Sequence, residues 1–258
     1  MQQTHEFGGA WTQEKLERLR KYLMAYTRIM NKKQYRFAYI DAFAGSGRIP
    51  PRASGEKSEP LFPEMDVDAI SFLNGSARIA LEVKPPFNKY FFIEKDVKKV
   101  ACLETLKNDY PKLADCITIV RDDANSYLQN LCNNFKWQKR RAVLFLDPFG
   151  MQVEWDTLKA IAGTKAIDLW LLFPIFVVNR LLRKDGKLPP IIEDKLNLLF
   201  GTDDWKQSFY QTEETEDLLG THQLVRKVGT FEKIARYFVD RLSTLFVGVS
   251  PNPLQLYN

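Results

Sequence analysis

Residues 37–48 read FAYIDAFAGSGR, and this stretch decides the fold. Its first part, FAYIDAF, is apolar almost throughout, which is typical of a strand buried on both faces of a sheet. Gly45 and Gly47 follow, and glycine lets the backbone turn sharply and come close to a ligand. A buried strand that ends in such a turn predicts a parallel α/β sheet with a ligand at its edge.

The rest of the chain repeats this alternation. Further strand-like runs occupy 89–94, 117–121, 142–147 and 167–173, and helical stretches near 96–108, 124–134 and 155–162 separate the later ones. A leading helix is expected from Thr12 to about Met30. Apolar strands separated by helices predict a doubly wound, mostly parallel sheet of the Rossmann-like kind.

The predicted organisation has three parts. The core is expected at 1–174, with a leading segment at 1–35 and an inserted loop at 49–74, which is rich in proline and charge; Gly75 and Ser76 would begin the helix that follows. A helical insertion or subdomain is expected at 175–230, with turns or a linker around 211–229. The last part, 231–258, would hold the final helix and a strand of the core at 245–249, cut short by truncation.

The composition argues against several classes of protein and of functional site. Apolar residues make up 45% and charged residues 27%, which is ordinary for a globular protein. The longest apolar runs are too short to span a bilayer, so no membrane contact and a cytoplasmic location are expected. Cys102, Cys116 and Cys132 lack paired spacing and are expected to be reduced packing thiols. With only His5 and His222, histidine-based metal or nucleophile sites are poorly supplied.

The net charge of +5 is compatible with an anionic partner but does not demonstrate one. Its distribution is more informative, because cations gather before one strand and after another. These clusters are either solvated ends of elements or a phosphate-binding face. Their members are Lys136, Lys139, Arg140 and Arg141 in the first and Arg180, Arg183, Lys184 and Lys187 in the second.

The phrase D-x-F-x-G-x-G after the first strand resembles the cofactor loop of S-adenosylmethionine-dependent methyltransferases. It differs from the G-x-G-x-x-G of dinucleotide-binding proteins, and no Lys-Ser or Lys-Thr follows as in a P-loop. A purely structural turn is the alternative. The candidate cofactor-binding residues here are Asp41, Phe43, Ala44, Gly45, Ser46 and Gly47.

Acidic residues end the next two strands. Glu94 is placed to accept hydrogen bonds from both ribose hydroxyls of an adenosine-containing ligand. It lies 49 residues after Gly45, and the 49–74 insertion accounts for the unusual separation. Asp123, followed by Ala124, is the candidate for the adenine amino group, with Asp122 as the alternative. Asp123 can equally cap the helix at 124–134.

Asp147-Pro148-Phe149-Gly150 ends the fourth strand. It resembles the Asp/Asn-Pro-Pro-aromatic motif with which amino-methyltransferases hold a target amine while an aromatic ring stacks on a flipped base. The second proline is absent here and the aromatic residue comes one position early. Asp147, Pro148 and Phe149 are the candidate catalytic residues, and a strand-terminating turn is the alternative.

Taken together, the chain resembles the three-Cys-motif partner protein family of bacteria. The resemblance implies a methyltransferase-like fold and a genetically linked three-Cys-motif protein as partner, but it implies no substrate. Its cysteine motif belongs to that neighbour, and Cys102, Cys116 and Cys132 form none. The matching phrases are Gly8-Gly9-x-Trp11-Thr12, Tyr22-Leu23-x-Ala25-Tyr26, Tyr39-Ile40-Asp41-x-Phe43-Ala44-Gly45, Phe92-Ile93-Glu94, Leu146-Asp147-Pro148-Phe149-Gly150 and Phe200-Gly201 with Trp205.

Three functions fit these residues. The leading hypothesis is an S-adenosylmethionine-dependent methyltransferase that acts on an amino group of a nucleic-acid base. The second is a non-catalytic module that recognises nucleic acid or a partner protein. The third is metal-dependent hydrolysis, with Asp41, Glu94, Asp122, Asp123 and Asp147 as ligands of a hard cation. The sequence leaves the oligomeric state open.

Overall fold

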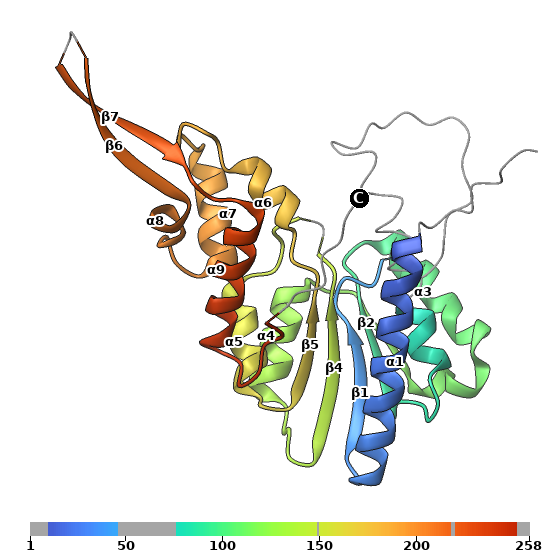
Figure 1. Ribbon diagram of the computed structural model, residues 1–258. Helices are drawn as coiled ribbons and strands as arrows, with labels where there is room; N and C mark the ends of the chain where they lie inside the picture. The colour runs from blue at the N-terminus through green and yellow to red at the C-terminus, as the bar shows by residue number, and fades with distance from the viewer. Residues whose placement is uncertain (1–9, 46–75, 149, 218–219, 252–258) are drawn as a thin grey trace, which may run out of the picture.

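The computed structural model describes residues 10–45, 76–148, 150–217 and 220–251, without the side chains of 10–16, 215–217 and 220–222. Five parallel strands form one sheet in the order β3-β2-β1-β4-β5 (Figure 1). This is the strand order of the doubly wound, Rossmann-like fold, so the predicted fold class is confirmed. The strands are β1 (Arg36–Asp41), β2 (Lys89–Ile93), β3 (Ile117–Val120), β4 (Arg140–Leu146) and β5 (Ile167–Leu171).

Helices alternate with these strands along the chain, close to the predicted positions. The leading helix is α1 (Ala10–Lys32), and a helical segment at 76–82 precedes β2. The others in this part are α3 (Val97–Asp109), the 3₁₀ helix η1 (Pro111–Cys116), α4 (Ala124–Asn134) and α5 (Trp155–Gly163). The predicted loop at 49–74, with Gly75, lies outside the described residues.

Both faces of the sheet are covered. Alternate residues of β1 enter different cores: Tyr39 packs with α1 and the 76–82 helix, and Ile40 packs with α4 and α5. Figure 1 shows α1 and α3 on one side of the sheet and α4 and α5 on the other. Burial on both faces explains why the strands carry continuous apolar sequences.

The chain reverses its direction of winding between β1 and β4. Beyond β1, the amide of Ala42 donates to Phe145 of β4, and the amide of Ala44 donates to Ile93 of β2, each over 3.1 Å. The residues after β1 therefore pass from the β4 side to the β2 side at the carboxyl edge of the sheet. In an open α/β sheet this switch point is where ligands bind.

The C-terminal region begins with α6 (Ile175–Leu181), α7 (Pro190–Phe200) and α8 (Trp205–Phe209). These helices follow the expectation of a helical part after residue 175. A long antiparallel hairpin then forms from β6 (Tyr210–Asp217) and β7 (Gly220–Lys227), before the final helix α9 (Phe231–Ser243). Figure 1 shows the hairpin projecting away from the sheet.

Two predictions for this region were wrong. The segment 211–229, expected to be turn or linker, is largely hairpin. The strand expected at 245–249 is not formed: the chain leaves α9 in a turn, Leu245 and Phe246 pack against the core, and Val247 is fully exposed. The apolar run at 245–249 follows the end of α9 and packs as an irregular segment. No described strand lies beside it with which it could pair.

The C-terminal region shares its core with the sheet. Phe173, which follows β5, stacks on Phe238 of α9 with ring centroids 4.0 Å apart. Arg241 of α9 donates twice to the carbonyl of Phe200, over 2.7 and 3.2 Å, and its guanidinium lies 4.5 Å from the ring centroid of Trp155 in α5. Gly201 has φ +69° and lies against Trp155, so a side chain there would collide with the indole.

None of the helices in the described part of the chain has the length and apolar character needed to cross a bilayer. The three cysteines are free thiols. Cys132 is buried between α4 and the sheet, and burial raises the pKa of its thiol to about 12. These observations match the expectation of reduced packing cysteines.

Candidate functional site

The carboxyl edge of the sheet gathers the acidic side chains, beginning with Asp41 at the end of β1. This side chain is completely buried on the same face of the strand as Tyr39. Ser76 donates from Oγ to Asp41 Oδ2 over 3.2 Å. Oδ1 is also buried and has no hydrogen-bond partner among the described residues. A buried carboxyl oxygen in this state is costly, and such groups collect at functional sites.

Its surroundings favour the protonated form of Asp41. Burial, followed by the negative charge of Asp147, raises the pKa of this carboxyl from 3.8 to about 7. Burial and the neighbouring Asp41 also hold the pKa of the Tyr39 phenol well above 10. Asp41 and Asp147 end neighbouring strands at the switch point, and their carboxyl groups interact there.

The turn after β1 contains Gly45 in a backbone conformation that favours glycine. Gly45 has φ +61°, in the left-handed region that residues with a side chain rarely adopt. Ala44 is fully buried, and Phe43 packs against the α4–α5 core. Ser46 and Gly47 lie outside the described residues, so their predicted contact with a cofactor stays a prediction.

Glu94 is held against this turn. Its Oε2 accepts a hydrogen bond from the amide of Gly45 over 3.1 Å, and its Oε1 accepts one from the amide of Asp96 over 3.0 Å. Each oxygen keeps further acceptor capacity, because a carboxylate has about four lone-pair sites. The structure therefore brings together Gly45 and Glu94, two of the residues predicted to bind the cofactor.

The acidic residues after β3 have structural partners. Asp123 is the N-cap of α4 and accepts from the amide of Ser126 over 3.1 Å, while Asp122 accepts from the amide of Asp123 over 2.8 Å. Ala124 is buried in the first turn of this helix. The capping alternative is thus realised, and the Asp123 carboxylate still has acceptor sites for a ligand.

A buried asparagine holds the loop that follows Asp147 and Pro148. Asn125 of α4 donates to the carbonyl of Gln152 over 2.8 Å and accepts from the amide of Glu154 over 3.1 Å. It also accepts from Thr157 Oγ1 over 2.9 Å. Sequence reasoning missed Asn125, because a single asparagine in a helix gives no sign that it supports a distant loop. Phe149 lies outside the described residues.

The described residues contain no group of three or more His, Cys, Asp or Glu side chains placed to hold a metal ion. Asp41, Glu94, Asp122, Asp123 and Asp147 follow one edge of the sheet without converging on one point. The described residues therefore do not form the cation site that the hydrolase alternative suggests.

The fold and this edge define a Rossmann-like α/β protein with acidic side chains at the carboxyl ends of its strands. No family model and no curated protein matches the chain. Solved structures similar to it include a putative methyltransferase, YhhF, from Escherichia coli (14% identity, 81% of this chain and 85% of that chain, TM-score 0.32). A protein from Legionella pneumophila, LPL1258, is 15% identical and covers 90% of this chain and 91% of its own, with a TM-score of 0.42.

A conserved hypothetical protein from Streptococcus pyogenes is also similar, with 15% identity, 75% of this chain and 88% of that chain covered, and a TM-score of 0.34. Identities and TM-scores this low transfer no activity or substrate to the present chain. The fold is assigned from its own strand order, and the resemblance to the three-Cys-motif partner family stays a prediction.

Proposed function

We propose that the carboxyl edge binds S-adenosylmethionine and directs its methyl group to a nitrogen acceptor, for which an amino group of a nucleic-acid base is the expected class. The observation that carries this proposal is the hydrogen bond from the Gly45 amide to Glu94 at the switch point. It fixes a carboxylate at the end of β2 beside a turned backbone at the end of β1, where an adenosine-containing ligand would lie.

The described residues fit this cofactor. Glu94 would accept from the ribose hydroxyls with the lone pairs that Gly45 and Asp96 leave unused. Asp123, with Ala124 behind it, would face the adenine. When bound, the cofactor supplies an electrophilic methyl group on a sulfonium centre. The turn from Phe43 to Gly47 would complete the cradle.

The acceptor would lie beside Asp147 and Pro148. A carboxylate and a backbone carbonyl there can accept the hydrogens of an amine and so orient its lone pair, with Phe149 as the proposed stacking ring. Direct displacement depends chiefly on this alignment. The scarcity of histidine in the chain is therefore no obstacle.

Titration calorimetry with S-adenosylmethionine and S-adenosylhomocysteine tests the binding half. Glu94→Ala should weaken binding by about a hundredfold or more, because two hydrogen bonds to a charged acceptor are lost. Glu104→Ala is the matched control, since this glutamate lies on α3 and pairs with Lys107. Absence of binding at millimolar ligand by the folded wild-type chain would refute the proposal.

The second candidate, a recognition module with this fold, is favoured by the projecting β6–β7 hairpin, on which Leu224 is 47% exposed (Figure 1). The family resemblance adds a genetically linked three-Cys-motif protein as its proposed partner. Asp147→Ala separates the candidates. In an enzyme this variant keeps cofactor affinity and loses transfer of labelled methyl groups to nucleic acid; in a module it leaves the biological output unchanged.

A further inference from the structure

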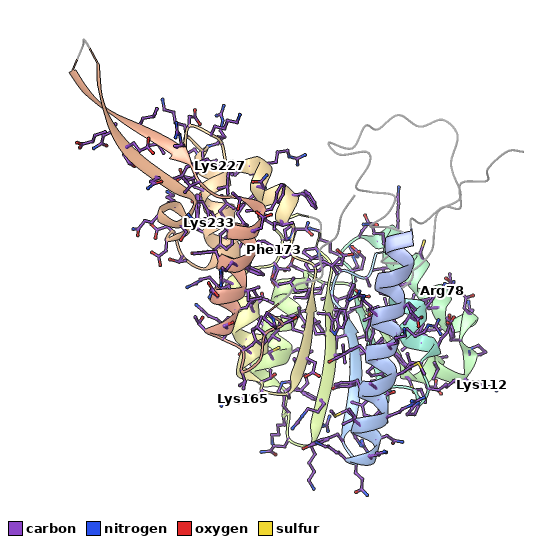
Figure 2. The ribbon with its side chains drawn as sticks, viewed as in Figure 1. Arg78, Lys112, Lys165, Phe173, Lys227 and Lys233 are labelled. Carbon is purple, nitrogen blue, oxygen red and sulfur yellow. The ribbon has the colours of Figure 1, made fainter. Side chains whose placement is uncertain are left out.

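The amino edge of the sheet, opposite the candidate site, is strongly basic. The turns at 31–36, 134–141 and 163–166 lead into β1, β4 and β5, which are neighbours in the sheet. None of these turns contains an Asp or Glu. Together they form the basic edge, whose cations are Lys32, Lys33, Arg36, Lys136, Lys139, Arg140, Arg141 and Lys165. Figure 2 shows Lys165 at the lower end of the sheet.

Among the described residues, these cations have no acidic partner. The ion pairs among the described residues all involve other cations, and none joins a side chain of the basic edge to a described carboxylate. The acid nearest in the sheet is Asp168 of β5, and it accepts a hydrogen bond from the Tyr22 hydroxyl over 2.7 Å. The basic edge thus presents uncompensated positive charge, which attracts polyanions.

Two of these lysines occupy unfavourable backbone positions. Lys139 has φ +54° and Lys165 has φ +51°, in the left-handed region. Gly or Asn is the usual residue there, and Lys165 follows α5 at the position where helices commonly end in glycine. A lysine in such a turn costs stability without a gain in packing, because both side chains are exposed.

Repulsion between two arginines on neighbouring strands also lowers the stability of the basic edge. Arg36 of β1 and Arg140 of β4 are register partners on adjacent strands. Like charges that face each other across a sheet repel and destabilise it. An anionic partner would remove this repulsion on binding.

Aromatic rings lie among the cations. The guanidinium of Arg140 is 4.7 Å from the ring centroid of Phe135, and that of Arg141 is 4.3 Å from the ring centroid of Tyr35. Phe135 is 38% exposed and contacts Trp137, with ring centroids 5.1 Å apart. Phe135 is exposed and Tyr35 and Trp137 are half-buried, and rings among arginines suit unpaired bases, which stack on them while phosphates contact the cations.

We propose that the basic edge binds single-stranded nucleic acid. Phosphates contact the lysines and arginines, and a base stacks on Phe135. This binding is independent of the cofactor and of the proposed methyl transfer, because the two sites lie at opposite edges of the sheet. If both proposals hold, the basic edge anchors a strand whose target base reaches the carboxyl edge of the same molecule or of another.

The test uses fluorescence anisotropy with labelled single-stranded DNA and RNA of about 20 nucleotides and a duplex of the same sequence. The variant Lys139→Gly/Lys165→Gly removes two cations from left-handed positions that glycine accepts. Binding should weaken at least about tenfold at low salt, and the slope of log affinity against log salt should fall by about 1.4, since each phosphate contact contributes about 0.7. The melting temperature should stay equal or rise.

Lys195→Ala/Lys233→Ala is the matched control, because it removes the same charge from exposed positions on α7 and α9. Equal weakening by both double variants would overturn the proposal, as would preference for the duplex or binding confined to anionic vesicles. Phe135→Ala tests the stacking contact, which should weaken single-strand binding about tenfold without changing the salt slope. Calorimetry with S-adenosylmethionine on the same variants should show unchanged affinity, so failure here leaves the proposed cofactor site untouched.

Discussion

The two edges of the parallel sheet carry opposite charge and bury it to different degrees. β1 begins with Arg36 and ends with Asp41, and β4 begins with Arg140 and leads to Asp147. Because the strands are parallel, their cations collect at one edge and their carboxyl groups at the other. Asp41 is completely buried, whereas the ends of Arg36 and Arg140 are exposed. Burial and the charge of Asp147 raise the pKa of Asp41 at the first edge, and the second edge offers exposed charge to a partner.

The largest expected effect concerns the buried edge. The folded state holds a proton on Asp41 up to about pH 7, and the unfolded chain releases it near pH 3.8. Raising the pH between these values therefore lowers the stability of the wild type. The free energy of unfolding of Asp41→Asn, relative to wild type, should grow by at most about 4 kcal/mol between about pH 4 and about pH 8. Urea denaturation across this range measures it.

Asp147→Asn sharpens the same experiment. The negative charge of Asp147 is the second cause of the raised pKa of Asp41, so its removal should move the loss of stability to lower pH. Parallel curves for wild type and Asp41→Asn over the whole range would show that Asp41 does not titrate there. The two edges would then differ in the sign of their charge but not in a shifted pKa.

The next effect concerns the support of the carboxyl edge. Asn125→Ala removes the three hydrogen bonds of a buried side chain, two that hold the loop after Asp147 to α4 and one from Thr157 of α5. Its loss should lower the free energy of unfolding by about 3 kcal/mol, since the groups left behind stay buried. Asn134→Ala is the control: this exposed asparagine of the same helix bonds only to Asn130 among the described residues, and should change stability by less than about 0.5 kcal/mol. Similar losses in both variants would contradict the anchoring role.

The smallest effect concerns the exposed edge and has the opposite sign. Arg36→Thr removes the repulsion from Arg140 and introduces a residue that favours strands. It should raise the free energy of unfolding by a few tenths of a kcal/mol at low salt, and the gain should shrink at about 0.5 M NaCl because salt screens the charges. A destabilised variant would mean that Arg36 makes a favourable contact within the chain.

The sequence predicted correctly those elements whose residue pattern is compatible with one type of structure. The continuous apolar run before Asp41 fits only a strand covered on both faces, and Gly45 next to it marks the turn that meets Glu94. It failed for the hairpin, because YQTEETED at 210–217 has no apolar alternation and carries four acidic residues. It failed again at 245–249, where local apolar character gave no information about strand partners.

Those residues of the candidate site that directly follow strands could be predicted from the sequence. Asp41, Glu94, Asp123 and Asp147 all follow apolar runs, so the rule for parallel sheets places them at one edge. Asn125 follows no such rule, and its role depends on a loop 27 to 32 residues away. The raised pKa of Asp41 could not be predicted either, because burial and the approach of Asp147 arise only from the packed structure.

The contact of Arg241 with Phe200 and Trp155 has a consequence for how the chain unfolds. It joins the last helix to α5 within one apolar core that also contains Ile40 of β1 and Leu144 of β4. A boundary after residue 174 would cut through this core. Calorimetric melting should accordingly give a single transition, and a fragment ending at β5 would expose the apolar side chains that α7 and α9 cover and be prone to aggregation.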